Sequence, residues 1–150
     1  MNLPNNTLVL VADGRKMLFL RNHGNTIKMN LRIEAHYEQD NPANRDQASA
    51  AQGRSVASVG NRRSAMEETD FHQIEEDHFA ADAADLLRAR ALDGDFETLV
   101  VVAPPRTLGE LRKHYHKEVA KRIVDEIDKD LTGHPINEIE AALTAMLLNK

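Results

Sequence analysis

Thr98-Leu99-Val100-Val101-Val102-Ala103, residues 98–103, is the stretch that decides the fold, and Pro104-Pro105 follows it directly. A continuous apolar run of this length, rich in β-branched residues, predicts a central strand buried on both faces of a sheet. The two prolines end the strand. Thr107 and Glu110 then match a capping box, which predicts that a new helix begins almost at once.

Three further strands are expected before this one. Residues 8–12, Leu-Val-Leu-Val-Ala, form a short apolar run that ends at Asp13-Gly14, a dipeptide typical of hairpin turns. A second strand is expected over 16–21. In 27–33 apolar residues alternate with polar ones, which predicts a half-exposed third strand. Together these segments predict an antiparallel meander.

The regular pattern stops after the meander. From Glu38 to Thr69 small and polar residues dominate, and a loop of this length in a compact domain is either disordered or functional. Asp70 and Gln73 match a second capping box, which predicts the start of a long helix that continues to about Leu92.

Two more helices are expected after residue 114. The first is an amphipathic helix that runs toward Asp130, with apolar residues spaced by four: Tyr115, Val119, Ile123 and Ile127. Pro135 starts the last helix, with four residues inward: Ile136, Ile139, Leu143 and Met146. The predicted order is β-β-β-α-β-α-α-α, an α/β fold in which helices pack on one mixed sheet. We expect one domain over 1–150, with a flexible loop at about 38–69.

Composition narrows the classes of function. The chain has 150 residues, 41% of them hydrophobic, which is enough for one core. Its net charge of -5 argues against a basic nucleic-acid binder as a whole, although a local basic face remains open. Without cysteine, disulfides and thiolate metal sites are excluded. No signal peptide or membrane-spanning run is recognised, so we expect a cytoplasmic protein without membrane contact.

Several segments carry a resemblance to a known family: 11–14 with 17–19, 63–67 through 79–80, 103–112, and Lys129-Asp130-Leu131-Thr132. They resemble the bacterial host-attachment proteins, "protein required for attachment to host cells". That family is in turn similar to the middle domain of archaeal and eukaryotic class-1 peptide release factors. The resemblance implies a meander, a long loop and a following helix in the order found here.

In the release-factor domain the long loop carries Gly-Gly-Gln, which promotes hydrolysis of peptidyl-tRNA. The corresponding stretch here is Ala50-Ala51-Gln52-Gly53-Arg54, a glutamine beside small residues that departs from the motif. Ala51 resists the backbone conformations that glycine allows, because of its Cβ atom. Gln52 is therefore a weak catalytic candidate. Asp13 is another, as an acid or base, although a hairpin turn alone explains it.

Arginines and lysines form two groups that suit phosphate. In the loop the candidates for RNA or phosphate binding are Arg54, Arg62 and Arg63, with few acids between them. The second group follows the central strand and comprises Arg106, Arg112, Lys113, Lys117 and Lys121. Lys113, Lys117 and Lys121 are spaced by four, which predicts one exposed helical stripe. A solvated helix face is the alternative explanation of this group.

Ligand-rich residues between His72 and Asp82 lack the His-Glu-x-x-His spacing of a zinc site, so no metal or other cofactor is expected. We therefore predict a non-enzymatic or at most weakly hydrolytic protein that binds RNA or the ribosome in translation, with the ribosome or tRNA as partner. One alternative is a regulatory protein-interaction module that affects host attachment indirectly, with a protein partner. A second alternative is a peptidyl-tRNA or ester hydrolase.

Overall fold

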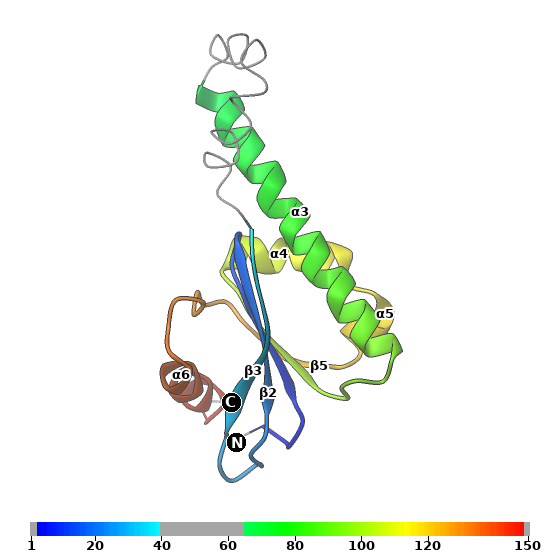
Figure 1. Ribbon diagram of the computed structural model, residues 1–150, viewed down its shortest axis with the longest axis vertical. Helices are drawn as coiled ribbons and strands as arrows, with labels where there is room; N and C mark the ends of the chain where they lie inside the picture. The colour runs from blue at the N-terminus through cyan, green and yellow to red at the C-terminus, as the bar shows by residue number, and fades with distance from the viewer. Residues whose placement is uncertain (1–2, 40–64, 149–150) are drawn as a thin grey trace.

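The computed structural model describes residues 3–39 and 65–148, with the backbone alone for 65–73 and 148 (Figure 1). Five strands form one sheet in the order β3-β2-β1-β4-β5. Their bounds are Leu8–Ala12 for β1, Lys16–Asn22 for β2, Leu31–Glu38 for β3, Leu99–Val102 for β4 and Ile123–Ile127 for β5. The α/β fold with one mixed sheet is thus confirmed.

Strand β4 lies inside the sheet between β1 and β5, as its apolar run predicts, although β1 is the middle strand. All four of its residues are completely buried, and it runs parallel to both β1 and β5. The predicted meander is also confirmed, because β1 pairs antiparallel with β2 and β2 with β3. In the β1–β2 turn, Gly14 leaves room for a side chain from the next helix: a Cβ atom there would lie 2.6 Å from Cδ of Glu76.

The third strand differs from the prediction at its start and in its alternation. It begins at Leu31 rather than Ile27, because the side chain of Asn25 accepts the N–H groups of Ile27 and Lys28 and closes a turn. The register against β2 then shifts: Leu20 pairs with Ile33 but Phe19 with Ala35. Glu34 is therefore the extra residue of a β-bulge, and the bulge turns residues 35 and 37 to the opposite face.

The long helix α3 spans Ala65–Leu92, so it begins before the predicted start at Asp70 and shortens the predicted loop. Asp70 lies inside the helix, and its capping box is wrong. Residues 40–64, the rest of the predicted loop, lie outside the described residues. At the other end Gly94, with φ +71°, ends the helix, and its N–H donates to the carbonyl of Ala91.

The region after β4 contains the largest correction. Helix α4 spans Pro105–His114, and a single turn, α5, spans Lys117–Ala120. Residues Ile123–Ile127 form strand β5, not the predicted helix toward Asp130. Pairing with β4 outweighs the four-residue spacing of the apolar side chains, since the strand supplies backbone partners along that buried edge. The element order is therefore β-β-β-α-β-α-α-β-α.

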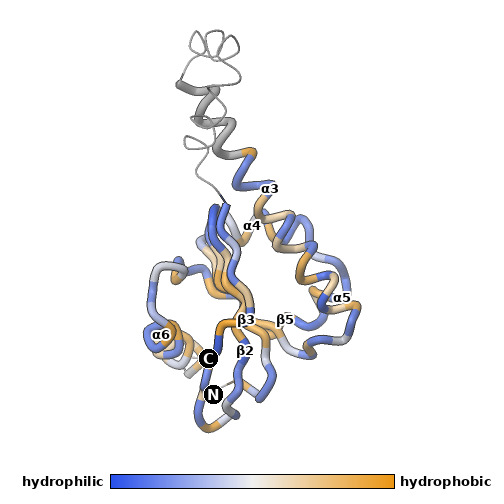
Figure 2. The backbone as a smooth tube through the Cα atoms, in the orientation of Figure 1, coloured by the Kyte–Doolittle hydropathy of each residue, from blue (hydrophilic) through white to orange (hydrophobic). Residues whose placement is uncertain are grey.

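Helices cover both faces of the sheet (Figure 1). Helices α3, α4 and α5 pack on one face, over Leu8, Leu10, Phe19 and Val101. The last helix, α6 (Ile136–Leu148), covers the other face and buries Ile139 and Leu143, as predicted. In Figure 2 hydrophobic colours gather along the middle of the strands, between these two layers.

Candidate nucleic-acid interface at the carboxyl edge of the sheet

The carboxyl ends of the parallel strands β1, β4 and β5 meet at one edge, where open α/β sheets commonly bind ligands. Asp13 follows β1, and Pro104 follows β4. Past the end of β5, the hydroxyl of Thr132 lies 2.7 Å from Oδ2 of Asp13 and 3.0 Å from Oδ1 of Asp130. Segments distant in the sequence are thereby joined at this edge.

The carboxylate of Asp13 is heavily used in these contacts. Its Oδ1 accepts the N–H groups of Arg15 and Lys16, both at 2.7 Å, while Oδ2 accepts the Thr132 hydroxyl. These donors give Asp13 a structural role, which is to close the hairpin and fasten it to the chain beyond β5. Its role as a catalytic acid or base remains a prediction, as does that of Gln52, which lies outside the described residues.

Helix α4 begins at the same edge. Its N-cap is Pro104, with Pro105 in the first turn and no side-chain capping bond, so the predicted capping box of Thr107 is wrong. The fixed φ of proline suits the first helical position, where no N–H is needed. Arg106 is exposed in this first turn.

The predicted stripe of Lys113, Lys117 and Lys121 is not on one helix. Lys113 belongs to α4, Lys117 starts α5, and Lys121 is the C-cap of α5. The chain turns between the two helices because His116 caps α5, with its Nδ1 accepting the N–H of Glu118 at 3.0 Å. The lysines therefore lie on two short helices joined by a bend.

Carboxylates partner much of the second basic group. Lys113 pairs with Glu110 at 2.8 Å, and this hydrogen bond raises the pKa of Lys113. Arg112 pairs with Glu126 of β5 at 3.2 Å.

Glu118 is shared by two cations. It lies 2.9 Å from Lys121 and 3.0 Å from Arg122, and these hydrogen bonds lower its pKa. Among the side chains that the structure describes, those of residues 3–39 and 74–147, Arg106 and Lys117 have no ion-pair partner. A phosphate can therefore bind Arg106 or Lys117 without displacing a carboxylate of the described residues.

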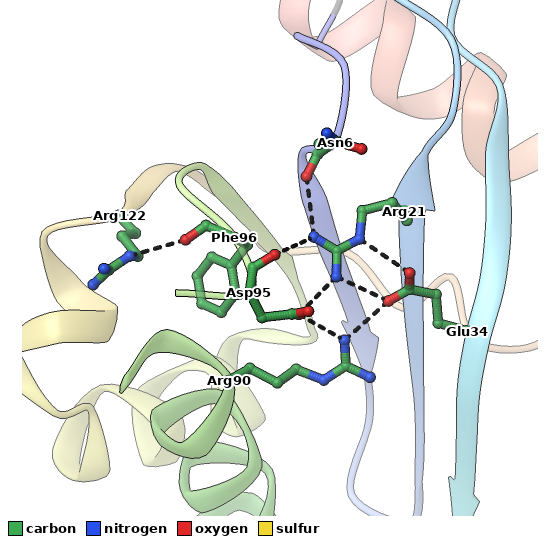
Figure 3. A network of polar contacts seen from close by, with 7 residues as sticks. All are labelled: Asn6, Arg21, Glu34, Arg90, Asp95, Phe96 and Arg122. Atoms are coloured by element: carbon green, nitrogen blue, oxygen red, sulfur yellow. Dashed lines mark hydrogen bonds and ion pairs between the residues drawn. The ribbon is translucent and has the colours of Figure 1, made fainter. Parts of the chain in front are cut away.

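Another charged cluster, which was not predicted from the sequence, links α3 to strands β2 and β3 (Figure 3). Arg21 pairs with Glu34 at 3.1 Å and with Asp95 at 2.6 Å, and Arg90 contacts the same two carboxylates. The guanidinium of Arg90 also lies 4.9 Å from the ring centroid of Phe19. One sign was available: Arg21 directly follows the apolar run Met17-Leu18-Phe19-Leu20 of β2.

Burial alone lowers the pKa of Arg21, but its hydrogen bonds with Glu34 and Asp95 outweigh this and raise it. Burial alone raises the pKa of Glu34 and of Asp95, yet hydrogen bonds from the arginines lower both. Arg21, Glu34 and Asp95 therefore remain charged at neutral pH. Because each charge faces an opposite one, the cluster holds the fold together rather than offering a vacant binding site.

Three other predictions concern the loop arginines, a metal site and a membrane-spanning helix. Arg54, Arg62 and Arg63 lie outside the described residues. In the part of the chain that the structure describes, no three histidines or acids gather closely enough to hold a metal ion. Nor does any helix in that part have the length and apolar character needed to cross a membrane.

No curated protein matches the sequence. The family model of bacterial archaeo-eukaryotic release factor family 12 matches residues 6–143, from the turn before β1 into α6. This match confirms the predicted release-factor likeness and suggests a translation-related role, whereas the host-attachment resemblance remains a prediction. The chain therefore belongs to bacterial archaeo-eukaryotic release factor family 12.

Proposed function

We propose that this protein binds RNA on the ribosome during translation, through phosphate contacts at the carboxyl edge of the sheet. One observation carries the proposal: Arg106 lies at the edge where residues 40–64, which include Arg54 and Arg62, join the described structure. On one side the chain leaves β3, whose Glu38 pairs with Lys16. The chain returns to the described structure in α3, whose Glu76 lies against Gly14 of the β1–β2 hairpin, close to Lys16.

The charges at this edge support binding to phosphate. Arg106 is exposed in the first turn of α4, where backbone N–H groups are free of intrahelical partners. Lys117 is a second exposed cation, on α5, where the chain has turned back toward the start of β5 at the opposite edge of the sheet. The sequence adds three more basic residues, Arg54, Arg62 and Arg63, on a protein whose net charge is -5. Such a local arrangement favours a polyanion without making the whole molecule basic.

Ribosome co-sedimentation at 50 and 300 mM salt tests the proposal. The variant Arg106→Gln/Lys117→Gln is compared with Lys28→Gln/Arg88→Gln, which changes the net charge equally at exposed positions elsewhere. Loss of two phosphate contacts makes the slope of log affinity against log salt shallower by about 1.5. The control keeps the slope. Failure of the native protein to pellet at 50 mM salt refutes the proposal.

A loop variant extends the test to residues outside the described structure. Replacing Arg54, Arg62 and Arg63 by glutamine reduces pelleting further if the loop contacts phosphate. In the same preparation, Gln52→Ala tests the hydrolase alternative. Release of peptide from peptidyl-tRNA by the native chain, lost in this variant, would favour the enzyme. A cytoplasmic location and one functional domain over 1–150 belong to the same proposal.

The regulatory alternative has a surface of its own. A groove of about 570 Å³ lies between the β2–β3 turn and α6, and beside it Ile27 is 86% exposed. An apolar side chain this exposed favours contact with another protein. Ile27→Asp would abolish capture of such a partner at any salt concentration while leaving ribosome pelleting unchanged. An effect on host attachment in cells carrying this variant would support the indirect role.

A further inference from the structure

A second groove, of about 400 Å³, lies between α3 and the β3 edge of the sheet. Six residues line it: Met17, Tyr37, Phe79, Asp82, Asp85 and Leu86. Its floor is apolar, since it is formed by Met17 and Phe79, which are 1% and 8% exposed. The ring of Tyr37 forms one wall. It stands edge-on to Phe19, with 6.0 Å between the ring centroids, and is held there while 42% of the residue remains exposed.

Two carboxylates stand above this floor. Asp82 and Asp85 are three positions apart on α3, so they project on the same side of the helix. Both residues are exposed. Asp85 lies 3.8 Å from Arg88, a long contact between exposed side chains. Among the described residues, Asp82 has no ion-pair partner. Negative charge is therefore available at the rim, directly beside aromatic and aliphatic surface.

We propose that this groove binds an arginine or lysine side chain presented by a basic segment of a partner protein. Such side chains combine an apolar stem with a cationic head. The stem fits the floor, and the head meets the Tyr37 ring and the two carboxylates. The carboxylates repel nucleic-acid phosphate, and a purely apolar ligand would leave them unused. Charge complementarity thus selects the basic protein segment.

This surface adjoins the carboxyl edge of the sheet but shares no residue with the basic group of the candidate RNA interface. The groove is lined by residues of β2, β3 and α3, whereas Arg112 of α4 pairs with Glu126 of β5 at the other side of the sheet. The inference stands whether or not the RNA proposal does, because no residue is shared.

A fluorescent peptide of four Gly-Arg repeats is the probe, and the same peptide with citrulline in place of arginine tests the need for charge. The native chain binds the arginine peptide, and Asp82→Asn/Asp85→Asn weakens this binding about three- to tenfold in fluorescence anisotropy. The matched control Asp93→Asn/Glu97→Gln removes two exposed acids elsewhere and leaves affinity within about twofold. Equal weakening by both variants, or equal binding of the citrulline peptide, would overturn the proposal.

The aromatic wall has its own variant. Tyr37→Leu retains apolar bulk but removes the ring face, and we expect arginine-peptide binding to weaken about two- to fivefold. Circular dichroism identifies any variant that fails to fold. In the native chain, the ring-proton resonances of Tyr37 and Phe79 shift on titration with the arginine peptide. Unchanged aromatic resonances at saturating peptide would place binding elsewhere and refute the assignment.

Discussion

Replacing Arg21 by methionine tests the charged cluster that joins α3 to the sheet. The arginine has 8% of its side chain exposed and contacts two carboxylates, Glu34 and Asp95, whose side chains are 31% and 38% exposed. At this exposure each ion pair contributes about 0.5–1 kcal/mol. The guanidinium also donates to the carbonyl of Asp95 at 2.8 Å and of Asn6 at 3.3 Å. Each carbonyl left without a donor costs about 1 kcal/mol.

These contributions sum to about 3 kcal/mol, and the methionine side chain recovers part of the packing. We therefore expect Arg21→Met to lower the free energy of unfolding by about 2–3 kcal/mol at pH 7. Urea unfolding followed by far-ultraviolet circular dichroism measures it, because the chain has no tryptophan to report by fluorescence. The control is Arg88→Met. Among the described residues Arg88 has one ion-pair contact, an exposed one at 3.8 Å from Asp85, so its loss should cost less than about 0.5 kcal/mol.

The same variant has a pH dependence of defined sign. Hydrogen bonds from the arginines lower the pKa values of Glu34 and Asp95 below 4.5 and 3.8, despite burial. A lowered folded-state pKa stabilises the protein above the unfolded-state pKa, and this stability is lost as the pH falls through the folded-state value. The difference between native chain and Arg21→Met should therefore shrink from pH 7 to pH 3. A constant difference, or a loss at pH 7 no larger than that of Arg88→Met, would refute the reasoning.

Three further predictions use the same unfolding measurement. Thr132→Val removes the hydroxyl held by Asp13 and should cost about 1 kcal/mol, whereas Thr132→Ser should cost less; equal losses would contradict the hydrogen-bond explanation. Gly14→Ala should cost up to about 1 kcal/mol because Glu76 must move, and adding Glu76→Ala should recover most of it; no recovery would rule out the contact. Leu143→Ala should cost about 2–4 kcal/mol by leaving a cavity under α6, and a loss below about 1 kcal/mol would contradict its burial.

The sequence predicts the centre of the fold better than its edges. Residues 99–103 and 8–12 are buried on both faces, so their apolar runs carry an unambiguous pattern. Edge strands are only partly buried, and both contain a bulge: Glu34 in β3 and Val124 in β5. After each bulge, the following side chains point to the opposite face of the sheet from the one that simple alternation predicts. Simple alternation therefore fails in β3, while in β5 the spacing of Ile123 and Ile127 resembles a helix.

The candidate sites were only partly predictable for a related reason. Which lysines and arginines lie free depends on carboxylates brought in by tertiary contacts, such as Glu126 of β5 beside Arg112. The cluster around Arg21 and the groove beside Tyr37 join segments far apart in the chain. An arginine after an apolar run is a local sign of the cluster, but no local pattern indicates its partners or the groove. The resemblance to the release-factor domain indicated the family correctly, whereas the residue spacing in β5 did not indicate a strand. A resemblance depends on several segments together, so one misleading segment does not overturn it.

The parallel pairing of β1 with β4 has a consequence for synthesis of the protein. The hydroxyls of Thr7 and Thr98, just before these strands, lie 2.8 Å apart although 91 positions separate them. At about 5–20 residues per second, a ribosome needs several seconds to make the intervening chain. Until then the apolar edge of β1 has no partner, and the nascent meander is open to aggregation. Chaperone binding to chains that end before Leu99 should therefore exceed binding to chains that end after Val102.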